Sequence, residues 1–164
     1  LANVCQRWEE STANVELLGV KQIIVRIGLV LGRNSGMLKK MIPLFKFFIG
    51  GSIGTGKQML PWIHIDDVVE AIEFLIKSNI EDRIFNLCTP NPKNMDSFTQ
   101  IFAQVMNRPD KIKIPEVVVK TIFGEMARET ILAGQNAIPR ALLDSGYKFK
   151  YPKLKDAITD LIDQ

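Results

Sequence analysis

The sequence predicts an α/β fold: the last part of a doubly wound parallel sheet, followed by a small α/β lobe. A nearly continuous apolar, β-branched run over residues 22–32 is typical of a strand buried on both faces of a parallel sheet. Residues 1–18 precede it with apolar positions on one helical face and end at Gly19, a common helix terminator. A helix followed by a buried strand is half of a doubly wound unit.

Composition narrows the possible functions. The 164 residues are 46% hydrophobic and 24% charged, as expected of a globular domain with a real core. The net charge of +3 is small and Lys and Arg form no block, so we expect no nucleic-acid partner. The two cysteines have no metal-ligand spacing and the chain has no apolar run of about 18 residues, so the sequence indicates neither a metal site nor a membrane span.

The stretch from Gly54 to Ser78 predicts a short strand that leads into a helix. Trp62 and Ile63 favour a strand, and Asp66 or Asp67 is expected to cap the helix that follows. Apolar residues then recur at helical spacing, so one face of this helix must be buried. They are Val68, Val69, Ile72, Leu75 and Ile76.

The remaining pattern alternates helices and short strands. We expect helices over 36–48 (interrupted by Pro43), 95–106, 117–132, 139–145 and from 154 onward, and strands over 83–88 and 111–115. Trp8 and Met126, each at helical spacing with other apolar residues, are interpreted as core residues.

Residues 51–57 spell most of a phosphate-binding loop. Such a loop needs Ser or Thr after its lysine and a helix directly behind it. Gln58 follows Lys57 instead, and Pro61 with Trp62 makes the continuation extended. The glycines are therefore better explained by a tight turn.

His64 is the only histidine, so a role as catalytic acid or base is one hypothesis. Its place between two apolar strand residues favours a structural histidine hydrogen-bonded to a neighbouring loop. Asp66 and Asp67 could likewise act as an acid and base pair, but helix capping explains them more simply.

Several motifs together resemble one specific family, the atypical extended short-chain dehydrogenases/reductases of the NAD-dependent epimerase/dehydratase-like (nucleoside-diphosphate-sugar epimerase-like) branch. The motifs are Cys5-x-x-Trp8-Glu9, Val25 to Gly32, Gly54-x-Gly56-x-Gln58, Trp62 to Asp67, Gly124-Glu125-Met126, and Gly134-Gln135 with Pro139-Arg140. The resemblance covers the latter half of such a protein, so we expect the N-terminal Rossmann half to be missing. It implies that 1–35 and 58–90 belong to the Rossmann sheet, and 36–57 and 91–164 to the substrate lobe.

The resemblance also implies a cofactor, NADP or NAD with NADP favoured, and a site between the two lobes. The implied cofactor contacts are Ile27, Gly28, Leu29 and Val30. The implied substrate-pocket residues are Gly36, Met37, Leu38, Gln58 and Trp62. Other expected partners are the missing half or a second copy of the chain, and the expected location is the cytoplasm or an organelle matrix.

Two positions depart from the family pattern. Typical members carry Tyr-x-x-x-Lys on the first helix, where this chain has Leu1 and Cys5, and an Arg before the His motif, where it has Leu60. No catalytic residue is therefore assigned. The resemblance implies an NAD(P)-binding protein that is epimerase-like or oxidoreductase-like. The alternative is a non-catalytic dinucleotide-binding regulator or interaction protein of the cell or organelle division type.

Overall fold

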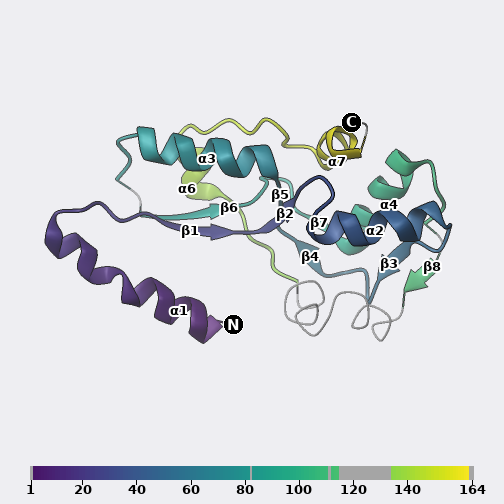
Figure 1. Ribbon diagram of the computed structural model, residues 1–164, viewed down its shortest axis with the longest axis horizontal. Helices are drawn as coiled ribbons and strands as arrows, with labels where there is room; N and C mark the ends of the chain where they lie inside the picture. Colours follow the sequence, from purple (N-terminus) through teal and green to yellow (C-terminus); the bar gives the residue numbers. More distant parts are fainter. Residues whose placement is uncertain (1, 82, 111, 115–133, 163–164) are drawn as a thin grey trace.

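Parallel strand pairs form the centre of the molecule. The computed structural model describes residues 2–81, 83–110, 112–114 and 134–162 (Figure 1). β1 (Ile24–Ile27) pairs in parallel with β6 (Ile84–Leu87), and β2 (Leu29–Leu31) pairs in parallel with β5 (Trp62–His64). The predicted strand over 22–32 is therefore two strands joined at Gly28.

Helices lie on both sides of these strands. α1 (Ala2–Ser11) leads through the 3-10 helix η1 (Ala13–Leu18) into β1, and α3 (Ile65–Lys77) follows β5 directly. In Figure 1, α1 and α3 lie on opposite sides of β1 and β6, the arrangement expected of a doubly wound unit. The short α6 (Arg140–Asp144) packs against β6.

A second group of elements lies beyond β2 and β5. It contains α2 (Gly36–Lys46), α4 (Met95–Met106) and α7 (Leu154–Ile162). β3 (Gly51–Ile53) pairs in parallel with β8 (Ile112–Ile114), and β4 (Met59–Leu60) pairs antiparallel with β7 (Lys93–Asn94). Figure 1 shows this group at the right of the view.

Two hydrophobic cores meet at β2 and β5. Side chains alternate between the two faces of a strand. Leu31 and Trp62 accordingly join the core built with α2, α4 and α7, whereas Val30 and Ile63 join the core built with α3, β6 and α6. These two strands therefore form the wall between the cores.

Two expectations are wrong. α2 continues three residues past Pro43, because Met41 and Phe45 on either side are buried and hold the helix in place despite the lost hydrogen bond. Trp8 is 70% exposed, because α1 stands off the sheet and leaves a groove beside it. Met126 and the predicted helix over 117–132 lie outside the described residues.

Candidate functional site

The main chain changes neighbours at Gly28. The Gly28 N–H donates to the Leu87 carbonyl of β6 at 2.9 Å, and the next N–H, that of Leu29, donates to the Pro61 carbonyl at 2.8 Å. The chain thus leaves β6 and joins β5 within one residue. In open α/β sheets, ligands bind outside the carboxyl ends of the parallel strands, and Gly28 follows the carboxyl end of β1.

The neighbouring backbone requires a glycine at position 28. A Cβ atom on residue 28 would lie 2.0 Å from the Pro61 carbonyl oxygen and 3.3 Å from the Cβ atom of Cys88. The oxygen belongs to backbone and has little freedom to move. Within the described residues, Gly28 therefore permits a close approach to the Pro61 carbonyl. A larger residue at position 28 would destabilise the fold, so its effect on cofactor binding could not be separated from its effect on folding.

The four predicted cofactor contacts differ in how open they are. The Ile27 side chain is 51% exposed. Leu29 and Val30 are half-buried and pack against the two different cores. Ile27 therefore offers the most accessible side chain of the set for a ligand at the end of β1.

A shallow groove lies between α1 and β1. Arg26 binds Glu9 through two hydrogen bonds of 2.7 Å, which tie α1 to the strand. Hydrogen bonding to Arg26 holds the pKa of the Glu9 carboxyl below its ordinary value. The groove encloses about 480 Å³ and is lined by Cys5, Trp8, Glu9, Thr12, Val15 and residues 21–25. Cys5, at the position for which the resemblance implies a lysine, therefore lies on an exposed surface.

The predicted substrate-pocket residues lie mostly under the surface. Gly36 is exposed at the start of α2 with a φ of +53°. Met37, Leu38 and Trp62 are buried in the core shared by α2, α4 and α7. The indole Nε1 of Trp62 is a buried donor for which the described residues provide no acceptor.

Gln58, the last predicted pocket residue, is 8% exposed and already hydrogen-bonded. Its Nε2 donates to the Ile53 carbonyl at 2.8 Å, and its Oε1 accepts from the Thr55 hydroxyl at 3.0 Å. These bonds close the glycine-rich turn between β3 and β4. The side chain therefore shapes the turn in this structure.

The same turn wraps the N-terminus of α4. The Asp96 N–H donates to the Gly56 carbonyl at 2.9 Å, and a Cβ on residue 56 would lie 1.9 Å from Asp96 Oδ1. Lys57 leads into strand β4 and not into a helix. The Asp96 carboxylate thus faces the glycines and would repel a phosphate. This supports the interpretation of residues 51–57 as a tight turn and not as a phosphate-binding loop.

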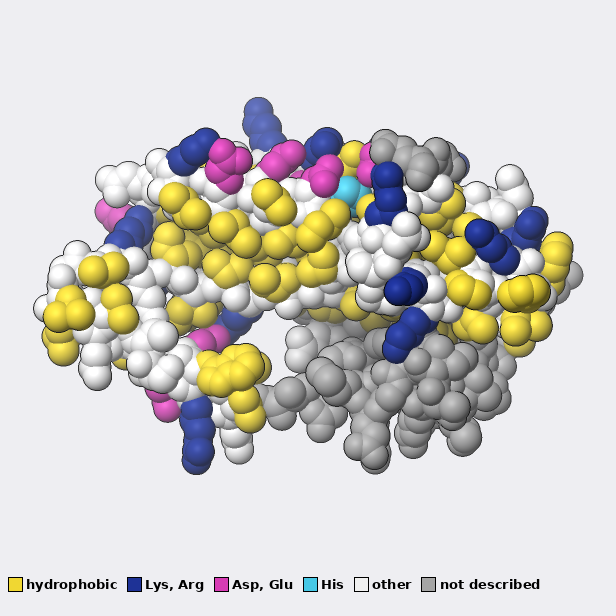
Figure 2. All heavy atoms as spheres, viewed as in Figure 1, with side chains coloured by type: hydrophobic (Ala, Val, Ile, Leu, Met, Phe, Trp, Pro, Cys, Tyr) yellow, Lys and Arg dark blue, Asp and Glu magenta, His cyan; other side chains and the backbone are white. Residues whose placement is uncertain are grey.

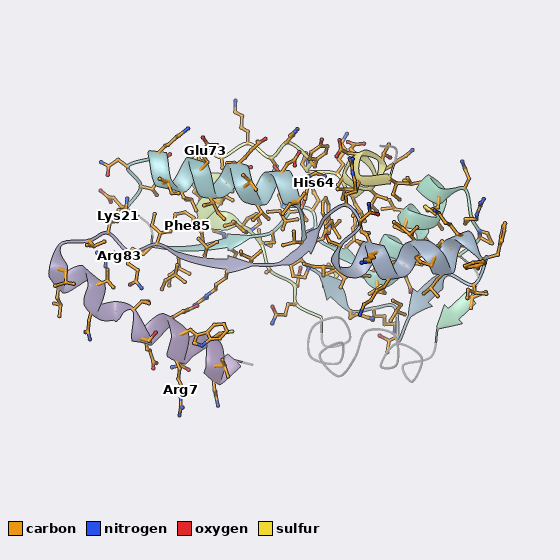
Figure 3. The ribbon with its side chains drawn as sticks, viewed as in Figure 1. Arg7, Lys21, His64, Glu73, Arg83 and Phe85 are labelled. Carbon is orange, nitrogen blue, oxygen red and sulfur yellow. The ribbon has the colours of Figure 1, made fainter. Side chains whose placement is uncertain are left out.

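His64 caps α3. Its Nδ1 accepts the Asp66 N–H at 3.1 Å, so the expected cap by Asp66 or Asp67 is wrong. The ring is 1% exposed and stacks on Tyr151 with 4.0 Å between ring centroids. Burial lowers the pKa of His64. Its Nε2 lies 3.4 Å from Asp160 Oδ2 and has no hydrogen-bond partner among the described residues. The capping bond and the burial of the ring at the start of α3 support the structural interpretation (Figure 3).

Asp67 joins α3 to the C-terminal part of the chain. The fully buried carboxylate accepts the Lys150 N–H at 2.7 Å, the Tyr151 N–H at 3.0 Å and the Tyr147 hydroxyl at 3.1 Å. Burial, with the nearby Asp67 charge, raises the pKa of Tyr147. We call Asp67 with Tyr147, Lys150 and Tyr151 the C-terminal latch. Sequence reasoning missed it, although the two tyrosines four residues apart were a signal.

Within the described residues, no three His, Cys, Asp or Glu side chains gather closely enough to hold a metal ion. No helix in that part of the chain is long and apolar enough to cross a membrane.

Known proteins resemble this chain along almost all of its length. An epimerase family protein of Mycobacterium leprae is 37% identical over 159 residues, which cover 97% of this chain and 52% of that protein. Residues 114–161 match a family described as a domain of unknown function, DUF1731. The chain is a relative of the epimerase family proteins. It spans about half the length of the curated relatives that it matches.

Solved structures agree with this relationship to the epimerase family. The human epimerase family protein SDR39U1 (isoform 2), crystallised with NADPH, is 33% identical with a TM-score of 0.81, covering 88% of this chain and 49% of that one. A nucleoside-diphosphate sugar epimerase from Corynebacterium glutamicum is 28% identical with a TM-score of 0.73, covering 98% and 30%. The similarity confirms the predicted α/β fold and the resemblance to extended short-chain dehydrogenases/reductases.

Proposed function

We propose that this chain is part of an NAD(P)-binding protein, epimerase-like or oxidoreductase-like, whose dinucleotide lies against the end of β1. The observation that carries the proposal is the structural match to the human relative solved with NADPH. NADP is the favoured cofactor on the same ground. When bound, the dinucleotide supplies or accepts a hydride.

The chain's own residues would position the ring and keep water away from it. Ile27 would make the direct contact because it is the open side chain at the end of β1. Leu29 and Val30 would add apolar surface beside Ile27. Gly28 would allow the main chain to pass close to the Pro61 carbonyl, where it leaves β6 and joins β5. A dry surface beside the reacting carbon favours hydride transfer over side reactions with water.

The substrate would lie near the start of α2. Gly36 is the exposed member of the predicted pocket, and Met37, Leu38, Gln58 and Trp62 would form the wall behind it. The unpartnered Trp62 Nε1 gives this wall one buried hydrogen-bond donor. Together these residues would join the 1–35 and 58–90 sheet elements to the substrate lobe.

The test is a fluorescence titration of NADPH and then NADH into the full-length protein, with the 164-residue chain as control. Micromolar binding by the full-length protein, and NADPH preferred over NADH, is the expected result. Ile27→Glu should weaken binding at least about tenfold, because burying a carboxylate against an aromatic ring is unfavourable. The matched control is Ile76→Glu on the exposed face of α3, which should bind normally. Undetectable binding of both dinucleotides would overturn the proposal.

A non-catalytic dinucleotide-binding regulator or interaction protein is the second candidate. The observation that favours it is Cys5, which lies exposed in the α1 groove at the position for which the resemblance implies a catalytic lysine. Tight NADPH binding with no hydride transfer across a panel of sugar nucleotides and carbonyl compounds would support this candidate. Turnover of any of these substrates would favour the enzyme.

A further inference from the structure

Three consecutive apolar residues are exposed where α2 ends. Phe47, Phe48 and Ile49 are 75%, 57% and 53% exposed. We call them the aromatic tip. Figure 2 shows apolar side chains at this end of the molecule, at the right of the view and far from α1 and β1. The aromatic tip is therefore separate from the proposed dinucleotide site.

The backbone at the aromatic tip favours glycine but holds an aromatic residue. Phe48 has a φ of +61°, in the left-handed region, and its N–H donates to the Phe45 carbonyl at 3.0 Å. The next N–H, that of Ile49, donates to the Leu44 carbonyl at 2.9 Å, as in a common helix-ending motif. Glycine fits this motif without strain, whereas a bulky residue is strained there. The helix end alone therefore does not explain the exposed ring.

The segment that carries the aromatic tip is basic. No Asp or Glu occurs between residues 17 and 65, whereas α2 carries Lys39, Lys40 and Lys46, the last of which directly precedes the aromatic tip. The Arg108 guanidinium also lies 4.7 Å from the centre of the Phe48 ring. On the face shown in Figure 2, the coloured side chains over α2 are basic or apolar.

We propose that the aromatic tip docks on an anionic lipid surface. Aromatic and aliphatic side chains enter the boundary between headgroups and acyl chains, and nearby lysines attract anionic headgroups. Three exposed apolar residues directly after Lys46, with Arg108 beside the Phe48 ring, meet both requirements. Because the apolar area is small and much of the attraction is electrostatic, binding should be reversible and should weaken with salt. The contact is peripheral and involves no membrane span.

The test is co-sedimentation of the full-length protein with vesicles of phosphatidylcholine containing about 30% phosphatidylglycerol, compared with phosphatidylcholine alone. Phe48→Gly should lower partitioning at least about tenfold, since it removes one of the two exposed aromatic rings of the tip. Glycine suits the left-handed backbone, so this variant should fold at least as well as the parent. Ile76→Ser, which removes a 77% exposed apolar side chain from α3, is the matched control and should bind normally.

Three results would overturn the proposal. One is equal binding to neutral and anionic vesicles, and another is unchanged partitioning of Phe48→Gly. The third is an equal loss for Ile76→Ser, which would indicate nonspecific adhesion. Sedimentation velocity distinguishes a protein partner: a dimer that Phe48→Gly converts to monomer, with no vesicle binding, would assign the tip to self-association.

Discussion

The two long helices that flank β1 and β6 are held in different ways. α3 begins at a buried histidine cap, and the side chain of its Asp67 accepts three hydrogen bonds from the other residues of the C-terminal latch. α1 is tied to β1 by the Arg26–Glu9 pair and leaves Trp8 exposed beside a groove. Buried polar contacts are costly to break, whereas exposed ion pairs contribute little. The α3 side is therefore the more firmly held of the two, and the α1 side has a solvent-exposed groove.

Asp67→Ala should cause the largest loss of stability. This change leaves the backbone N–H groups of Lys150 and Tyr151 without their buried acceptor, whereas the Tyr147 hydroxyl keeps the main-chain carbonyl of residue 67 as its acceptor. The expected cost is about 3 kcal/mol in unfolding free energy. Urea denaturation measures it. Asp66→Ala, at a partly exposed carboxylate paired with Lys150, is the control and should cost much less. Equal losses for both variants would show that the latch does not stabilise α3.

Gly28→Ala should have the next largest effect. The added Cβ would meet the Pro61 carbonyl oxygen, so the unfolding free energy should fall by about 2 kcal/mol. Gly32→Ala is the matched control. Its new Cβ would come nearest the Ser35 hydroxyl, at 2.7 Å, and that side chain can rotate away. If both variants lose the same unfolding free energy, the backbone around Gly28 and Pro61 can move to accommodate a Cβ atom, and the prediction is wrong.

The pH dependence of the unfolding free energy tests the buried His64 cap of α3. Burial lowers the pKa of His64 in the folded state, so the unfolded chain binds the proton more readily as the pH falls through about 6.5. The unfolding free energy should therefore decrease from pH 7 to pH 5, by at most about 1.4 kcal/mol per pH unit. His64→Asn keeps a capping acceptor and should lose this component. If His64→Asn and the parent protein had the same pH profile, His64 would not be the source of the pH dependence.

The smallest effect is expected on the α1 side. Glu9→Gln removes the charge that pairs with Arg26, so the backbone amides of α1 should exchange hydrogen faster. The melting temperature should stay almost the same, since the pair is exposed to solvent. Glu10→Gln, one residue along the same helix, is the control and should leave exchange unchanged. A large drop in melting temperature for Glu9→Gln would show that α1 is part of the cooperative core.

Local signals in the sequence predicted much of the fold. The helix expected over 95–106 has those bounds in the structure, because Asn94 caps it through the Ser97 N–H at 2.8 Å and Asn107 ends it in the left-handed region. The strands over 83–88 and 111–115 also formed within those ranges. Caps, terminators and periodicity involve neighbouring residues, so a single sequence displays them.

Other features depend on residues far apart in the chain. The latch partners of Asp67 lie 80 to 84 positions away, so nothing near Asp67 could reveal that it is fully buried. Gly28 shows the same limit, because the Pro61 carbonyl that requires a glycine there is 33 positions away, between β4 and β5. The nine site residues came from the resemblance, and their contacts with cofactor and substrate stay predictions.

The C-terminal latch also bears on the order in which this chain folds. A ribosome releases the α3 sequence long before Lys150 and Tyr151 emerge, so Asp67 must wait for its two backbone donors across a separation of 83 and 84 residues. Closing contacts of such long range slows folding. We expect the start of α3 to be among the last parts to gain its native structure, and nascent chains that stop before residue 150 to depend on chaperones.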